Sequence, residues 1–277
     1  MKIGYLLQEG VPNIRKKPFS GPANHVVYVI QELKKAGHQV SLLAKLDNKI
    51  YISDDLENFR PVEVRFLERG LIRLFEKIIR RIQYEFNLPY ANFFESLRFA
   101  FACRQVLSDC DIYFERMGWL GYGGAIASQL QHIPLIWEIN GDHIDEFKIR
   151  GITNAKSQQQ LSYYLMEKAT RKICHAVASG EGWRQKYIDR WRIEPTKITA
   201  VQNGSAIVDI LQAEDLKNFR PVESVQPIRI VYCGGFEVWH GIPILIHAVR
   251  HAIDSGCDLH VTLIGSGSER NNTVDLI

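Results

Sequence analysis

Two short apolar segments of this sequence end in polar residues that could bind a charged or sugar-like ligand. The segment 111–115 is followed by Arg116, and the segment 134–139 includes Glu138 and is followed by Asn140. In an open α/β sheet, ligands bind beyond the carboxyl ends of the parallel strands. We therefore interpret Arg116 as an anion or sugar contact, and Glu138 and Asn140 as part of the same edge. The alternative is that Glu138 and Asn140 only cap their strand.

The polar cluster continues with Asp142 and His143. An imidazole can serve as a general base, and Asp142 and Asp145 could complete a metal site with it. Adjacent residues of one loop rarely converge on a single ion, so the pattern disfavours a metal. We interpret Asp142 and His143 as acceptor or sugar contacts, with simple solvation as the alternative.

A loop with prolines and a glycine, residues 18–25, joins the first predicted strand to the first predicted helix. Free backbone amides and the helix dipole favour an anion at such a position, so a phosphate could bind beside Gly21. A turn without a ligand fits equally well, because no GxGxxG or P-loop pattern is present. Asn203 and Gly204 give a further turn signal that needs no ligand to explain it.

Glycines recur near the end of the sequence. Gly234 and Gly235 follow one apolar run, and Gly265 and Gly267 follow another. Glycine lets the backbone approach a ligand closely, and each pair lies between a predicted strand and a predicted helix. The pattern indicates two turns that could face a phosphate or a nucleotide.

The elements that must position these residues alternate between short β-branched segments and longer amphipathic ones. This rhythm is typical of parallel strands joined by crossover helices, so the predicted class is α/β. A helix is expected from about residue 23 to residue 35, ending at Gly37. Strands are expected at residues 3–7, 40–44, 62–66, 111–115, 134–139, 175–178 and 197–201.

Two prolines interrupt the stretch 218–227, which has neither a helical nor a strand period. We place an interdomain linker there, between a complete Rossmann-like domain at 1–217 and a second one at 228–277. The second domain is predicted to contain strands at 228–233 and 259–264, a helix at 242–253, and the start of another helix. So few elements do not close a layered domain, so we expect this part to be incomplete and unstable alone.

Composition argues against several classes of protein. The 34 basic and 31 acidic residues give a net charge of +3, which offers no general field for nucleic acid. Five cysteines without a CxxC pair indicate a reducing cytoplasm. We find no signal-peptide pattern and no run approaching the roughly 18 apolar residues that span a bilayer. The expected location is therefore cytoplasmic.

One predicted helix, residues 67–81, is amphipathic and basic. Its apolar side chains share one face, and its cations lie elsewhere: Leu67, Leu71, Leu74 and Ile78 against Arg69, Arg73, Lys77, Arg80 and Arg81. Such a helix can lie on anionic lipid, which would place the protein on the inner face of the plasma membrane. It can equally pack on the sheet with a solvated basic face.

Taken together, these motifs resemble those of the family 4 glycosyltransferases, which have the GT-B fold. The resemblance rests on six motifs in order along the chain: the Gly21 loop, Glu115-Arg116, Glu138-Ile139-Asn140, Val201-Gln202-Asn203-Gly204, the segment 234–241, and Gly265-Ser266-Gly267. It spans essentially the whole chain, and the combination is far more specific than any one member. The resemblance implies two Rossmann-like domains and a retaining, metal-independent transfer of a sugar from a nucleotide-diphosphate donor, with no cofactor.

Roles follow from the resemblance residue by residue. The glycines implied at the donor phosphates are Gly21, Gly234, Gly235, Gly265 and Gly267. Backbone amides and basic groups there would stabilise the charge that grows on the leaving diphosphate. The residues implied in catalysis are Glu138, Asn140 and His240, and those implied in acceptor or sugar contact are Arg116, Asp142, His143 and Asn203.

The sequence departs from the family pattern at several positions. Asn140 stands where many relatives have histidine, Gly235 where many have arginine, and His240 where many have lysine. Lysine is always charged near neutral pH, whereas histidine is fully cationic only if its pKa exceeds about 7. The family's paired glutamates, spaced eight apart, have no counterpart before Ile277. We therefore expect a C-terminally truncated chain without transferase activity of its own.

The resemblance favours a hexosyltransferase-like enzyme of surface polysaccharide or glycolipid synthesis. Its partners would be a nucleotide sugar and a saccharide or lipid-linked acceptor. Two alternatives stay open: a non-catalytic remnant that acts as a binding module, and another GT-B enzyme such as a sugar-nucleotide 2-epimerase. A nicotinamide oxidoreductase is disfavoured because no GxGxxG follows Leu7.

Overall fold

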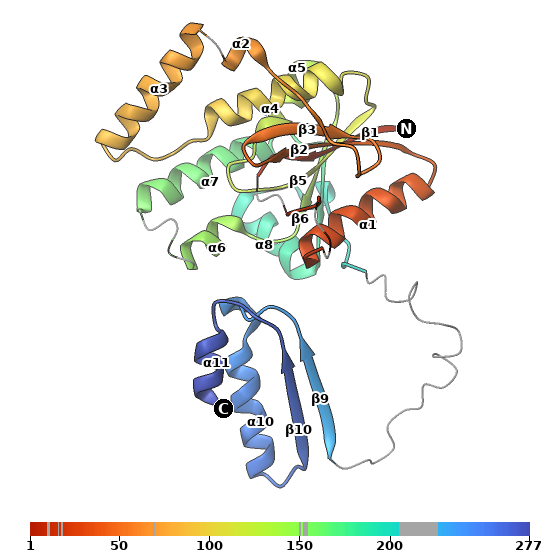
Figure 1. Cartoon of the computed structure of the whole chain (residues 1–277), viewed down its shortest axis with the longest axis vertical. Helices are drawn as coiled ribbons and strands as arrows, with labels where there is room; N and C mark the ends of the chain where they lie inside the picture. The colour runs from red at the N-terminus through yellow and green to blue at the C-terminus, as the bar shows by residue number, and fades with distance from the viewer. Residues whose placement is uncertain are drawn as a thin grey trace. The chain divides into compact units, whose positions relative to one another are not determined.

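The computed structural model describes residues 1–9, 12–15, 17, 19–68, 70–149, 151, 155–204 and 227–277 (Figure 1). The chain forms two compact units, Met1–Ala206 and Ile207–Ile277. Of the predicted linker 218–227, only Pro227 lies within the described residues. The predicted domain boundaries therefore stay predictions.

In its described part, the first unit is built around an eight-stranded sheet with the order β4-β3-β2-β1-β5-β6-β7-β8. The strands are β1 Lys2–Leu7, β2 Gln39–Leu46, β3 Lys49–Ser53, β4 Arg60–Pro61, β5 Ile112–Arg116, β6 Leu135–Ile139, β7 His175–Ala178 and β8 Ile198–Ala200. All are parallel except β3 and β4, which pair antiparallel at one edge. The predicted α/β class is confirmed.

Helices cover both faces of this sheet (Figure 1). They are α1 Gly21–Lys35, α2 Arg65–Glu68, α3 Gly70–Glu85, α4 Phe93–Val106, α5 Gly123–Gln131, α6 His143–Ile149, α7 Lys156–Thr170 and α8 Glu181–Trp191. Successive residues of a strand point to opposite faces. Tyr5 and Leu7 of β1 accordingly pack in the cluster with Val26 of α1, while Leu6 packs in the cluster on the other face.

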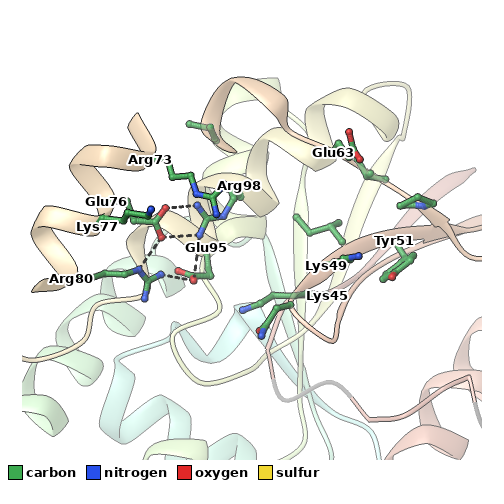
Figure 2. A pocket seen from close by; sticks show the side chains of 15 residues that line it. Lys45, Lys49, Tyr51, Glu63, Arg73, Glu76, Lys77, Arg80, Glu95 and Arg98 are labelled. Carbon is green, nitrogen blue, oxygen red and sulfur yellow. Dashed lines mark hydrogen bonds and ion pairs between the residues drawn. The ribbon is translucent and has the colours of Figure 1, made fainter. Parts of the chain in front are cut away.

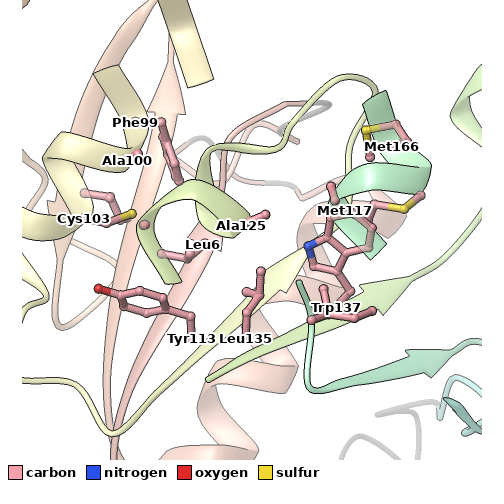
Figure 3. Close-up of a cluster of buried hydrophobic side chains, with 14 of the residues drawn as sticks. Leu6, Phe99, Ala100, Cys103, Tyr113, Met117, Ala125, Leu135, Trp137 and Met166 are labelled. Carbon is pink, nitrogen blue, oxygen red and sulfur yellow. The ribbon is translucent and has the colours of Figure 1, made fainter. Parts of the chain in front are cut away.

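The larger buried cluster lies on the face that α4 and α5 cover (Figure 3). Phe99 of α4, Tyr113 of β5 and Trp137 of β6 are fully buried in it. Burying an apolar side chain of this size contributes roughly 2–3 kcal/mol. This cluster fixes how β5 and β6 lie, and with them the polar residues at their carboxyl ends.

The antiparallel edge departs from the prediction. Residues 62–66 were expected to form a strand, but residues 62–64 are a loop and Arg65 begins α2, so that expectation is wrong. The alternation of Val62 and Val64 imitates a strand because both side chains are buried from the loop. The sequence reading also missed β3, which follows a two-residue turn at Asp47 and Asn48. Both have positive φ, as such hairpin turns require.

The amphipathic segment forms two helices, α2 and α3, and its apolar face does not pack on the sheet. Leu67 is buried, but Leu71, Leu74 and Ile78 are 83%, 54% and 49% exposed. Glu76 is the only buried side chain of α3 among the described residues. The helix therefore turns a polar face toward the unit and an apolar face toward solvent.

Within residues 227–277 the second unit contains two parallel strands, two α-helices and a short 3-10 helix at Val238–His240. The strands and α-helices are β9 Ile228–Cys233, α10 Ile242–Asp254, β10 Leu259–Ile264 and α11 Arg270–Leu276. These elements match the predicted ones. Gly241 has a positive φ and caps the N-terminus of α10. The unit is thus the β-α-β start of a second Rossmann-like fold, as expected.

Glu115 of β5 is an unusual member of the core. It is 1% exposed, and its Oε2 accepts a hydrogen bond from Trp137 Nε1 at 2.8 Å. Its Oε1 has no partner among the described residues. Burial raises the pKa of Glu115 to about 8, because the charged form loses its hydration. Glu115 is therefore protonated at neutral pH and does not face a ligand, unlike its neighbour Arg116.

This burial predicts a pH dependence of stability. The folded-state pKa of about 8 lies above the ordinary value of 4.5. The stability that depends on neutral Glu115 is therefore full below about pH 4.5 and is lost as the pH rises to about 8. In wild type we expect the free energy of unfolding, measured with urea, to fall by on the order of 2–4 kcal/mol between pH 5 and 8. In Glu115→Gln this fall should be absent. An exposed control, Glu181→Gln, should keep the wild-type loss, and the same loss in Glu115→Gln would contradict the assignment.

Candidate active site

Four polar side chains meet on the α1 face of the first unit. Glu138 Oε2 accepts a hydrogen bond from the Tyr5 hydroxyl at 2.6 Å, and its Oε1 accepts one from Asn140 Nδ2 at 2.8 Å. His25 Nε2, from α1, contacts the same Oε1. Glu138 is 5% exposed. The predicted residues Glu138 and Asn140 therefore lie together, joined by two residues that the sequence reading did not single out.

Strand register brings this cluster to one edge of the sheet. Arg116 of β5 is the direct partner of Glu138 of β6, and Phe114 of β5 stacks on Tyr5 with ring centroids 5.5 Å apart. The strand order reverses between β1 and β5, which is the point where open α/β sheets form their ligand crevice. The cluster thus lies where this fold class binds ligands.

The start of α1 completes this edge. Ser20 caps the helix, with its Oγ accepting from Ala23 N at 3.4 Å, and Pro22 lies in the first turn. His25 follows Gly21 by four residues, so the two share a helix face. A Cβ added at Gly21 would meet nothing within 4 Å. Packing within the unit therefore does not require glycine there, and a ligand has room to approach.

The charge on Glu138 is stabilised by its neighbours. Burial raises the pKa of Glu138, but the hydrogen bond and charge of His25 lower it, and Tyr5 and Asn140 add further hydrogen bonds. The net effect holds the pKa below its ordinary value of 4.5. Burial and the negative charge of Glu138 raise the pKa of Tyr5, which keeps that hydroxyl protonated as a donor.

Arg116 supplies positive charge beside this carboxylate. Its side chain is half-buried, and it makes no hydrogen bond or ion pair with any residue that the structure describes. Its register opposite Glu138 places it beside the cluster, and its charge partly opposes the rise in the pKa of Tyr5. A half-buried arginine without a partner is suited to bind an anion.

Asp142 and His143 are engaged within the protein. Asp142 is 1% exposed, and its carboxylate accepts from Ile144 N at 3.1 Å and from Arg190 Nη1 at 2.6 Å. His143 Nε2 lies 2.9 Å from the Met117 carbonyl oxygen. Both residues therefore hold the start of α6 in place. Their predicted contact with an acceptor stays a prediction.

Asn203 lies apart from the Glu138 cluster in the strand order. It follows β8, at the far edge of the sheet, and is exposed. It makes no hydrogen bond with the described residues, so its sugar contact also stays a prediction.

In the second unit, the two glycine turns pack on each other. Gly234 N donates to Ile264 O at 3.0 Å, and Phe236 N donates to Ser266 O at 2.9 Å. A Cβ at Gly265 would lie 1.8 Å from Gly234 O, and one at Gly267 would lie 2.5 Å from Phe236 O. These two glycines are thus required by the close approach of the turns, whatever ligand they bind.

His240 also has a partner in this region. Its Nδ1 lies 2.6 Å from the carbonyl oxygen of Gly235. Because a carbonyl can only accept, Nδ1 carries a hydrogen, and Nε2 donates to a phosphate only in the imidazolium form. Among the described residues, no group of three or more histidine, cysteine, aspartate or glutamate side chains is placed to hold a metal ion.

Comparison with known proteins identifies the family. Residues 19–206, well over half of the chain, match the model described as Glycosyltransferase Family 4, and the chain therefore belongs to that family. No curated protein sequence matches it. The predicted family resemblance is confirmed.

Solved structures support the GT-B fold. The chain is similar to the lipopolysaccharide outer core galactosyltransferase WaaB in apo form, with 13% identity, a TM-score of 0.55 and coverage of 100% of this chain and 64% of that one. The chain is also similar to a glycosyltransferase from Rickettsia africae, with 15% identity, a TM-score of 0.54 and coverage of 99% of this chain and 62% of that one. A third similar structure is HepE of Anabaena in complex with UDP, with 16% identity, a TM-score of 0.53 and coverage of 99% of this chain and 64% of that one. The chain thus spans less than two thirds of the length of these structures.

The cluster predicts that His25 controls the ionisation of Glu138. Because the pKa of Glu138 is lowered in the folded protein, its ionised carboxylate stabilises the fold at pH values above 4.5, the ordinary pKa of this group. This stabilisation is lost as the pH falls through the lowered pKa. In His25→Ala we expect the pKa of Glu138 to rise, because burial then acts with less opposition. Carbon-13 NMR of the carboxyl groups measures it. His143→Ala is the control, and an unchanged pKa of Glu138 in His25→Ala would show that His25 is not its partner.

The glycines predict contrasting effects on stability. Gly265→Ala should destabilise the second unit by about 2 kcal/mol or more, because its Cβ would collide with backbone. Gly21→Ala should leave the first unit as stable as wild type. Hydrogen exchange of the amides in β9 and β10, and in β1, reports the two units separately. Unchanged exchange of β9 and β10 in Gly265→Ala would refute the packing role.

Proposed function

We propose that this protein acts in the transfer of a sugar from a nucleotide-diphosphate donor to a saccharide or lipid-linked acceptor, in surface polysaccharide or glycolipid synthesis. The first unit would carry the acceptor side. The observation that carries this proposal is the buried, charged Glu138 held by His25, Tyr5 and Asn140 at the switch point of the sheet. Family membership supports the reaction class.

The cluster suggests a division of roles. Glu138 is almost fully buried and already accepts from three side chains, so we assign it to positioning His25 and Asn140. Asn140 and Arg116 are only half-buried. Asn140 can hydrogen-bond sugar hydroxyls, and the charge of Arg116 can stabilise a developing anion. These two would be the residues that meet ligands.

The donor side would lie in the second unit. The turns at Gly234–Gly235 and Gly265–Gly267 stand at the carboxyl ends of β9 and β10, where a fold of this class binds phosphate. The structure of HepE was determined with UDP, which supports a nucleotide donor here. We propose that backbone amides and imidazolium His240 offset the charge of the leaving diphosphate, without a metal ion.

A transfer assay tests the proposed reaction. Labelled nucleotide sugars are given to the natively expressed protein together with membranes of its source organism. With the protein expressed from its native gene we expect label to enter lipid or polysaccharide, whereas residues 1–277 alone are expected to be inactive. Transfer should fall about 100-fold in Arg116→Ala and in Asn140→Ala, a typical loss for one transition-state contact. Arg171→Ala, an exposed arginine, is the control. Failure to transfer any of the sugars would favour a binding module, and unimpaired variants would exclude this site.

We further propose that α3 docks the protein on the inner face of the plasma membrane. Its exposed side chains include an apolar stripe: Leu71, Leu74, Phe75, Ile78 and Ile82. Lys77 and Arg81 lie outside this stripe and can meet anionic headgroups. No helix within the described residues is long and apolar enough to cross a bilayer. A lipid-linked acceptor would then be within reach of the enzyme at the membrane surface.

Liposome flotation tests this contact. Wild type should float with vesicles of phosphatidylcholine and phosphatidylglycerol, and Leu71→Ser/Phe75→Ser should be recovered several-fold less, because two exposed apolar side chains are lost. Leu130→Ser, which removes a half-exposed leucine of α5, is the matched control. Equal recovery of wild type and the double variant would rule out docking through α3.

A further inference from the structure

A cavity of about 700 Å³ lies between α3, α4 and the β2–β3 hairpin (Figure 2). Figure 2 shows Arg73, Glu76, Arg80, Glu95 and Arg98 on one side of it and residues of the hairpin on the other. Lys45 follows Leu43 by two residues in β2, so it points to the same face as Leu43, the α4 face. The cavity is therefore separate from the Glu138 cluster, which lies on the α1 face.

The lining of this cavity carries more positive than negative charge. Its charged residues are Lys45, Lys49, Arg73, Lys77, Arg80 and Arg98, against Glu63, Glu76 and Glu95. The chain as a whole is nearly balanced, with 34 basic and 31 acidic residues. Six cations and three carboxylates thus line one concave place.

Two of the three carboxylates are already neutralised by arginines of the wall. Arg98 donates to both oxygens of Glu76, at 2.6 and 3.0 Å, and Arg80 Nε donates to Glu76 Oε1 at 2.9 Å. The hydrogen bonds from Arg98, and to a lesser extent that from Arg80, lower the pKa of Glu76. Glu76 therefore stays ionised near neutral pH. Arg80 and Arg98 also pair with Glu95. This network forms a fixed charged wall and holds the polar face of α3 against α4.

The lysines of the lining take no part in this network. Lys49 and Lys77 make no ion pair with any described residue, and Lys45 pairs with Glu9, which does not line the cavity. Both Lys49 and Lys77 are exposed. An anion in the cavity could therefore bind them without breaking an existing ion pair.

We propose that this cavity binds a phosphate ester, as a phosphate or a diphosphate group. A multivalent anion can contact both Lys49 and Lys77, whereas a single carboxylate would neutralise only one of them. Lysine and arginine are the usual protein partners of phosphate. The volume lies within the roughly 300–1,000 Å³ of small-molecule sites. The site is additional to the proposed transfer reaction and does not depend on it.

Calorimetric titration of the full chain with pyrophosphate tests the site. Wild type should bind pyrophosphate, and Lys49→Gln/Lys77→Gln should bind it at least about 10-fold more weakly. Both residues are exposed and unpaired among the described residues, so the variant should fold like wild type. The control is Arg104→Gln/Lys172→Gln, which removes two exposed cations outside the cavity. No binding by wild type, or equal loss in variant and control, would overturn the proposal.

A second arm distinguishes a lipid phosphate from a soluble one. Flotation with phosphatidic acid vesicles is repeated with added pyrophosphate, using Leu71→Ser/Phe75→Ser as the reference for α3 docking. Competition by pyrophosphate would assign the cavity to a lipid phosphate, and calorimetric binding without competition would assign it to a soluble phosphate ester. The docking variant should still bind pyrophosphate like wild type. If Leu71→Ser/Phe75→Ser lost pyrophosphate binding, the proposal that the cavity binds phosphate independently of the outer face of α3 would be refuted.

Discussion

The carboxylate of Glu138 must be satisfied inside the protein, and much of the first unit is arranged around that requirement. A buried charge without partners is strongly unfavourable, so its donors have to be brought to it. They come from β1, from α1 and from the residue that follows β6. One side chain thereby fixes three elements at the edge where ligands bind. This arrangement explains why the edge can be preformed before a sugar arrives.

The adjacent strand β5 shows how one sheet gives two carboxylates opposite properties. Glu115 points into the apolar cluster and stays neutral, whereas Glu138 points to the α1 face and stays charged. Arg116 follows Glu115 but shares the face of Glu138, because strand residues alternate. The adjacent residues Glu115 and Arg116 therefore have different roles. Glu115 packs in the core, and Arg116 brings positive charge to the crevice.

Much of this fold could be predicted from sequence, because β-branched runs and amphipathic stretches report which segments are strands and helices. The β3 hairpin escaped because its turn, Asp47-Asn48, is less distinctive than Asn-Gly. The loop at Val62 and Val64 misled because burial of alternate residues is also what a strand requires. For α3, the sequence gives an apolar stripe but not its direction. The direction follows from Glu76, which turns inward to reach Arg98 on α4.

The candidate site was predicted only in part for a similar reason. Glu138, Asn140 and Arg116 could be found because each stands at the end of a strand. Tyr5 and His25 could not, since their role depends on which strands and helices adjoin β6 in space. No local pattern marks either residue: Tyr5 reads as one more strand side chain, and His25 reads as one more residue of a helix.

The central claim is that Glu138 acts by positioning Asn140, whose Nδ2 donates to it at 2.8 Å, and a double-mutant cycle tests this claim most directly. Transfer rates of the natively expressed protein are measured for wild type, Glu138→Gln, Asn140→Ala and the combination of both. We predict that the double variant is hardly slower than either single variant, with a coupling of about 1–3 kcal/mol. Additive losses, with a coupling near zero, would contradict the account and show that the two residues work independently.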